Sequence, residues 1–140
     1  MLSRKYAKIL EVLIENSGLP IKEISRRTGI PITTVHNRIK KMEQEGIIKC
    51  YKAIIDTKKI GMNIQAFLQI TAKELNEEKI NKIASLPNVN ECYILSGPND
   101  VLLKVSAEDI DKLNDFTDKQ LRTLDWIRDV VTYVIMKNVK

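Results

Sequence analysis

The fold of this chain is decided by residues 28–48, whose sequence is TGIPITTVHNRIKKMEQEGII. Pro31 suits the start of a helix and Gly46 its end. Three apolar residues between them recur at i, i+4 and i+7 on one helix face: Val35, Ile39 and Met42. A tight turn precedes Pro31, and such a turn sets two helices at a large angle in a helix-turn-helix. The stretch therefore predicts the second helix of that motif.

Two further helices are expected before this stretch. From Ser3 to Asn16 apolar residues recur at helical spacing, and Asn16 begins a stop signal. Pro20 suits the start of a short second helix, which Gly29 closes in the left-handed conformation. On the other side, residues 47–55 are β-prone and resemble a wing or linking strand.

The polar face of the helix after Pro31 predicts contact with double-stranded DNA. A helix fits the major groove, where short polar side chains read base edges and Lys or Arg bind phosphates. The base-reading candidates are Thr33, Thr34, His36 and Asn37. The phosphate-binding candidates are Arg38, Lys40 and Lys41, with Arg26 and Arg27 of the preceding helix. A solvated helix face is the alternative, since most polar stripes are that.

The charge distribution favours the DNA interpretation and indicates two domains. Residues 1–60 hold 13 Lys/Arg and 6 Asp/Glu, a net charge of +7, whereas residues 61–140 carry −2 of the total of +5. A basic half suits a polyanionic partner. We assign residues 1–50 to the helix-turn-helix domain, 51–62 to a linking strand and hinge, and 63–140 to a second domain.

The carboxyl half follows the order β-α-β-β-α-β. Strands are expected at 64–72, 92–95, 101–105 and 130–139, with turn formers at 96–100. Asn76 is expected to cap the first helix, and Ser106 with Asp109 forms a capping-box pattern before the second. The chain is therefore expected to be α+β, with a ferredoxin-like domain whose helices cover one face of an antiparallel sheet.

The last expected strand carries apolar residues on both faces. Val130, Val134 and Met136 lie on one face, and Val131, Tyr133, Ile135 and Val139 on the other. A monomer does not bury both faces completely, so we expect dimerisation through the sheet.

Composition excludes several other classes of protein. The 140 residues are 44% hydrophobic and 29% charged, and no apolar run is long enough for a membrane span, so we expect a cytoplasmic protein that does not bind membranes. The two cysteines are expected to be small packing residues. The single histidine has no catalytic partner at a defined spacing, so we expect no metal, no cofactor and no enzymatic activity.

The helix-turn-helix sequence from Gly29 to Ile48 resembles that of the Lrp/AsnC, or feast/famine, family. Ser96-Gly97-Pro98-Asn99-Asp100 is similar to that family's Gly-x-x-Asp loop, and Val131-Thr132-Tyr133-Val134-Ile135 to its threonine-bearing last strand. Two departures are visible. Pro20 and Pro31 stand where relatives usually have capping serines, and Asn99 stands where an aromatic residue is frequent.

The resemblance implies a prokaryotic transcription regulator with an effector-binding and oligomerising second domain. Members form homodimers that associate further, often into octamers, and many bind amino acids between dimers. It implies effector-binding roles for Ser96, Gly97, Asp100 and Thr132. The loop residues also suit a plain hairpin, because Gly permits positive φ and Asp bonds its own turn.

Two other functions stay open at this point. The chain could be a ligand sensor or oligomeric scaffold that does not bind DNA, although the basic amino half argues against this. Sirohaem decarboxylases also resemble the family, but they rely on histidines in the second domain, and here the only histidine is His36.

Overall fold

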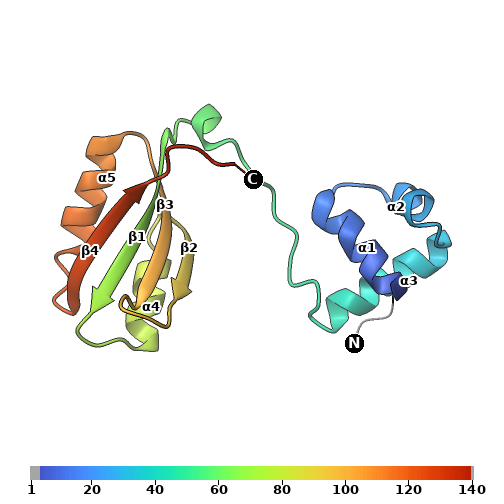
Figure 1. The fold of residues 1–140 in the computed structure, drawn as a ribbon, viewed down its shortest axis with the longest axis horizontal. Helices are drawn as coiled ribbons and strands as arrows, with labels where there is room; N and C mark the ends of the chain where they lie inside the picture. The colour runs from blue at the N-terminus through green and yellow to red at the C-terminus, as the bar shows by residue number, and fades with distance from the viewer. Residues whose placement is uncertain (1–3, 140) are drawn as a thin grey trace. The chain divides into compact units, whose positions relative to one another are not determined.

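The structure is a computed structural model that describes residues 4–139, and it divides into two compact units between Ile54 and Ile55 (Figure 1). The division lies within the segment assigned above to the linking strand and hinge. Each unit has its own core and is described by itself.

The first unit contains the three helices expected from the periodicity. They are α1 (Arg4–Glu15), α2 (Ile21–Thr28) and α3 (Ile32–Gln44). Apolar side chains from all three, and from the turn between α2 and α3, form one buried cluster: Ile9, Leu13, Ile24, Ile30, Val35 and Met42. The helix-turn-helix is therefore packed on α1.

The turn between α2 and α3 depends on one glycine. Gly29 has φ +68°, and its N–H donates to the Ser25 carbonyl at 2.9 Å. The Ser25 hydroxyl also donates to the Ile30 carbonyl at 2.6 Å, which fixes the chain on both sides of the turn. Pro20 and Pro31 are the N-cap residues of their helices and supply no side-chain cap, as their chemistry predicts.

The β-prone residues 47–55 form no strand, so that expectation was wrong for this chain by itself. A strand needs a neighbouring strand to pair with its backbone groups, and no described strand pairs with this segment. One short 3-10 turn, η1 (Thr57–Ile60), follows.

The second unit is a four-stranded antiparallel sheet with two helices. The strands are β1 (Ile64–Ala72), β2 (Val89–Ile94), β3 (Val101–Ala107) and β4 (Ile127–Val134), in the order β2-β3-β1-β4. The helices are α4 (Glu77–Ala84) and α5 (Ile110–Phe116), the latter continued by the π-helical turn η2 (Thr117–Leu121). This is the expected ferredoxin-like arrangement.

Both helices pack on the same face of the sheet. Leu68, Leu103 and Val130 from three strands share one core with Ile83 of α4 and Phe116 of α5. The opposite face carries the side chains that alternate with the core residues along each strand. No described helix or loop of this unit covers this face. Register places Phe67 opposite Tyr133 and Gln69 opposite Val131 there, with Leu102 and Tyr93 on the neighbouring strands.

Three local details differ from the sequence-based expectations. Ser106 lies inside β3 and donates to Asn90 Oδ1, so Asp109 alone caps α5, accepting from Lys112 N at 2.8 Å. Strand β2 starts at Val89, before the apolar run that marked it. Strand β4 spans Ile127–Val134, the stretch whose residues pair with β1 from Ala66 to Ala72, and one further hydrogen bond joins Ile135 N to the Gln65 carbonyl.

Candidate nucleic-acid interface and effector loop

Helix α3 has a buried spine and a polar outer face. Val35 and Met42 are completely buried against the other helices and fix the rotation of α3. Of the predicted base-reading residues, Thr33 and Asn37 are exposed, whereas Thr34 and His36 are half-buried. The exposed face therefore presents a hydroxyl and a carboxamide, which are groups that hydrogen-bond to base edges.

The two lysines of α3 extend this face toward its carboxyl end. Both are exposed, and Lys41 lies 3.8 Å from Glu45 in an i, i+4 ion pair. Lys40 has no ion pair within residues 4–139. Its ammonium group is free to bind a phosphate.

The two arginines of α2 share one carboxylate that sequence reasoning missed. Arg26 donates to both Glu23 oxygens, at 2.9 and 2.6 Å, and Arg27 Nε donates to Glu23 Oε1 at 3.1 Å. Arg27 also lies 3.8 Å from Glu15. The hydrogen bonds from Arg26 and then Arg27 lower the pKa of Glu23 to about 2. The i, i+3 and i, i+4 spacing was the signal that could have shown this.

Arg38 differs from the other basic residues of α3. Its guanidinium lies over the Tyr6 ring of α1, 5.1 Å from the centroid. Its Nη1 atom is fully buried and has no hydrogen-bond partner in the described part of the chain. The group thus packs between two helices and not on the outer face with Lys40.

A second contact missed by sequence reasoning joins α3 to the chain after it. The Tyr51 hydroxyl donates to Glu43 Oε1 at 2.8 Å. The pKa of Tyr51 is raised to about 12. Partial burial of the side chain is the larger cause, and the hydrogen bond to Glu43 is the second. The contact spans eight residues across a turn, so no helical or strand periodicity marks it.

In the second unit, the β2–β3 loop is held to the end of β1 by Asp100. Its Oδ2 accepts a hydrogen bond from Ala72 N at 2.7 Å, and its own N–H donates to the Ile70 carbonyl at 2.9 Å. Gly97 has φ +152° and, with Ser96, is exposed. One oxygen of the Asp100 carboxylate is therefore used by the fold.

Asn99 adds side-chain contacts to this loop. It accepts from the Thr71 hydroxyl at 3.1 Å and donates to Gln69 Oε1 at 3.1 Å. The residue that departs from the family pattern therefore joins the loop to β1, which is a role its amide can fill and an aromatic ring cannot.

Thr132 lies apart from the loop within one chain. It pairs with Leu68 on the β4 side of β1, whereas Asp100 bonds Ile70 and Ala72 from the β3 side. Two strand spacings, about 10 Å, separate the two positions across the sheet. Thr132 and Asp100 therefore do not contact each other in a single copy.

Among residues 4–139 no group of His, Cys, Asp and Glu side chains could hold a metal ion. Cys50 is exposed and Cys92 half-buried, and both are free thiols; burial raises the pKa of Cys92. None of the described helices is long and apolar enough to cross a membrane.

Comparisons with known proteins match both units. A model described as the Lrp/AsnC ligand binding domain matches residues 65–140, and one described as winged helix-turn-helix DNA-binding matches residues 7–49. The regulatory protein AsnC of Haemophilus influenzae is 34% identical over 133 residues, 94% of this chain and 89% of that protein.

Solved structures agree along the whole chain. LrpC of B. subtilis is 30% identical with a TM-score of 0.87, covering 100% of this chain and 98% of that one. A transcriptional regulator of Neisseria meningitidis in complex with L-Met is 26% identical with a TM-score of 0.92, covering 100% and 93%.

Proposed function

This chain belongs to the Lrp/AsnC family of transcriptional regulators, and we propose that it reads its operator with the exposed face of α3. The observation that carries this is the fixed rotation of α3: buried Val35 and Met42 turn Thr33, Asn37 and Lys40 outward together. The short polar side chains would contact base edges, while Lys40 and Lys41 would contact phosphates.

Selection of bound duplexes from a random DNA pool at moderate salt tests this proposal. Two recognition helices of a dimer should enrich a two-fold-symmetric motif with half-sites about one helical turn apart. On that motif, Asn37→Ala should relax sequence preference, whereas Lys40→Ala should weaken binding to all DNA and flatten its salt dependence. Equal losses on specific and random DNA for both variants would contradict these roles.

We infer further that the second unit binds an amino acid near the loop of residues 96–100. The Neisseria meningitidis neighbour was crystallised with L-Met. The backbone around Gly97 and the free oxygen of Asp100 are groups that could receive the charged ends of an amino acid. In an assembly, Thr132 of a second copy could complete this site, since Thr132 and Asp100 of one copy lie on different sides of β1.

Calorimetric titration with the twenty amino acids, L-Met first, tests this inference. Asp100→Asn keeps an acceptor for Ala72 N but removes the charge, so it should weaken binding without opening the hairpin. Asp111→Asn, on the helix layer, is the matched control. Unchanged amino-acid affinity in Asp100→Asn would remove Asp100 from the site.

The sheet face opposite the helices is proposed as the homodimer interface. Tyr93, Val131 and Tyr133 are exposed there, beside Phe67 and Leu102. An uncovered apolar sheet face is typical of an association surface. Further assembly of dimers, up to an octamer, would place a second copy beside each effector loop.

We propose a regulator, and not an enzyme or a scaffold without DNA binding, that acts in the cytoplasm where its DNA lies. The single histidine is on α3, so the second unit has none to offer for sirohaem chemistry. Tetrapyrrole colour in the purified protein would argue for the decarboxylase alternative.

A further inference from the structure

The chain after α3 is strongly basic. Between Gly46 and Ile60 there are four lysines and one acidic residue, a net charge of +3, which is nearly half of the +7 carried by residues 1–60. Two of these lysines, Lys49 and Lys52, lie in the first unit, and both are exposed. We call residues 47–52 the basic arm.

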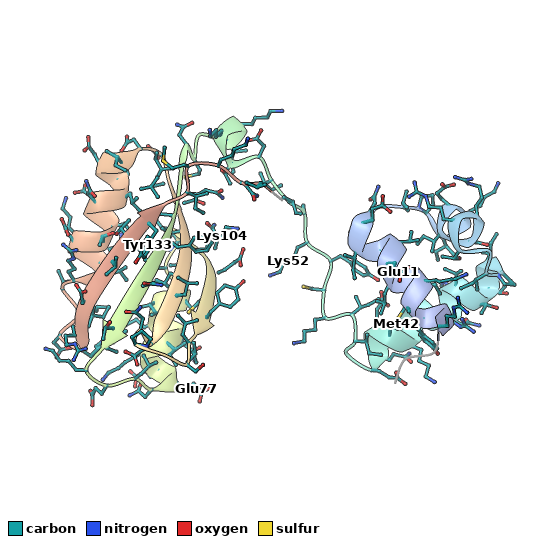
Figure 2. The ribbon with its side chains drawn as sticks, in the orientation of Figure 1. Glu11, Met42, Lys52, Glu77, Lys104 and Tyr133 are labelled. Atoms are coloured by element: carbon teal, nitrogen blue, oxygen red, sulfur yellow. The ribbon has the colours of Figure 1, made fainter. Side chains whose placement is uncertain are left out.

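The basic arm is attached to the carboxyl end of α3. The N–H groups of Ile47 and Ile48 donate to the Met42 carbonyl at 2.9 and 3.1 Å, and Ile48 packs against the helical core. The Tyr51 hydroxyl donates to Glu43 at 2.8 Å, so the arm is held to α3 at both ends. Lys49 and Lys52 therefore lie next to the residues that attach the arm to α3, and Figure 2 labels Lys52 on the chain that leaves this helix.

The charges at this end of α3 leave the arm's lysines available. Glu43 accepts from Tyr51, and Glu45 lies 3.8 Å from Lys41. Both carboxylates at this end of α3 thus contact side chains other than Lys49 and Lys52. In the described part of the chain neither Lys49 nor Lys52 has an ion pair.

We propose that the basic arm is a second DNA-contacting element, in which Lys49 and Lys52 bind phosphates flanking the groove that α3 enters. Three residues of open chain span at most about 10 Å. Lys49 and Lys52 therefore lie close enough together to contact phosphates of one short stretch of backbone. This inference rests on the proposed function of α3.

Salt titrations of DNA affinity test the arm with the double variant Lys49→Gln/Lys52→Gln. Loss of two phosphate contacts should lower the slope of log K against log salt by about 1.8 per bound copy. The wild type should then lose about 12-fold more affinity than the variant between 50 and 200 mM salt. The selected sequence motif should stay the same, because phosphate contacts carry no base readout.

The matched control is Lys73→Gln/Lys137→Gln, which removes the same charge from exposed positions of the second unit. A duplex trimmed to the selected motif should also bind the wild type and the arm variant more equally than one with flanking base pairs. A slope equal to that of the control variant would overturn the inference and leave the arm a solvated surface or a contact for an acidic protein.

The two proposals fail in different ways. If Asn37→Ala loses sequence preference while the arm variant keeps the wild-type salt slope, that result would support base reading by α3 and would overturn the proposal for the arm. If neither variant changes DNA binding, then the assignment of α3 itself is wrong.

Discussion

Glu23 binds both arginines of α2, which were predicted to contact phosphates. The two guanidinium groups donate three hydrogen bonds to its oxygens, and its lowered pKa, about 2, reports how strongly they favour the charged carboxylate. Arg26 and Arg27 must exchange this carboxylate for phosphates if they are to contact DNA. We therefore expect Glu23 to limit the DNA affinity that α2 contributes.

Glu23→Gln should strengthen DNA binding, because it frees both arginines and removes a negative charge. We expect a several-fold higher affinity at low salt, and a slope that is steeper by about 0.9 for each arginine that gains a phosphate. Glu11→Gln, an exposed position on α1, removes the same charge without releasing an arginine. Equal effects of the two variants in a filter-binding salt series would mean that net charge alone matters.

Arg38 should act on the position of α3 and not on phosphate. Its guanidinium lies over Tyr6, and a cation–π contact of this kind contributes about 1 kcal/mol. Arg38→Gln should therefore lower the stability of the first unit by roughly 1 kcal/mol and leave the salt slope unchanged. Lys40→Gln should do the reverse, with an unchanged melting curve and a slope lower by about 0.9. A lower slope in Arg38→Gln would assign its charge to the DNA contact.

At the scale of the elements, the helices and strands could be predicted because their signals are local. Val35 and Met42 mark the buried face of α3 by spacing alone, and alternation marks β1. Residues 47–55 show the limit, since β propensity cannot form a strand without a partner for its backbone. Strand β4 likewise ends where its pairing with β1 ends, and not where its apolar sequence does.

The sequence could predict which residues belong to the candidate site, but not which other residues they contact. The polar face of α3 follows from helix periodicity, whereas the seat of Arg38 on Tyr6 joins residues 32 positions apart in the sequence. The separation of Thr132 from Asp100 depends on the strand order of the sheet. A motif resemblance suggests a role for each residue but does not give the distance between two residues. Long-range geometry decided these outcomes.

The Tyr51–Glu43 contact predicts a pH dependence for the end of α3. The folded pKa of Tyr51, about 12, lies above its ordinary value of 10, so the contact stabilises fully below pH 10 and its contribution is lost as pH rises toward 12. Because the side chain is half exposed, we expect only about 0.5 kcal/mol. Thermal unfolding followed by circular dichroism should show the wild type more stable than Tyr51→Phe at pH 8, with the difference vanishing near pH 12.

Tyr133→Phe serves as the control for this comparison, since Tyr133 lies on the sheet of the second unit. The stability of the first unit should be the same in Tyr133→Phe and in the wild type at every pH from 8 to 12. A gap between the wild type and Tyr51→Phe that stays constant from pH 8 to 12 would contradict the predicted loss of this contact on ionisation of Tyr51.

At the scale of the whole molecule, we expect DNA recognition to depend on the proposed dimer interface, the open sheet face. Two linked recognition helices bind a two-part site with an avidity that can exceed either affinity by about 10² to 10⁴. In this protein the link would be the sheet face around Val131 and Tyr133, which are 37% and 52% exposed. Both are surface positions, so replacing them with acids should leave each copy folded.

Val131→Asp/Tyr133→Asp should therefore convert the dimer to monomers in sedimentation experiments, because two carboxylates would face two others across a desolvated interface. Binding to a two-part site should fall by at least about 100-fold, while binding to an isolated half-site stays within a few-fold of the wild type. Ile110→Asp is the control, since it replaces an exposed apolar residue with an acid at the start of α5, where an acid is tolerated. A double variant that sediments as a dimer would place the interface on another surface of the chain.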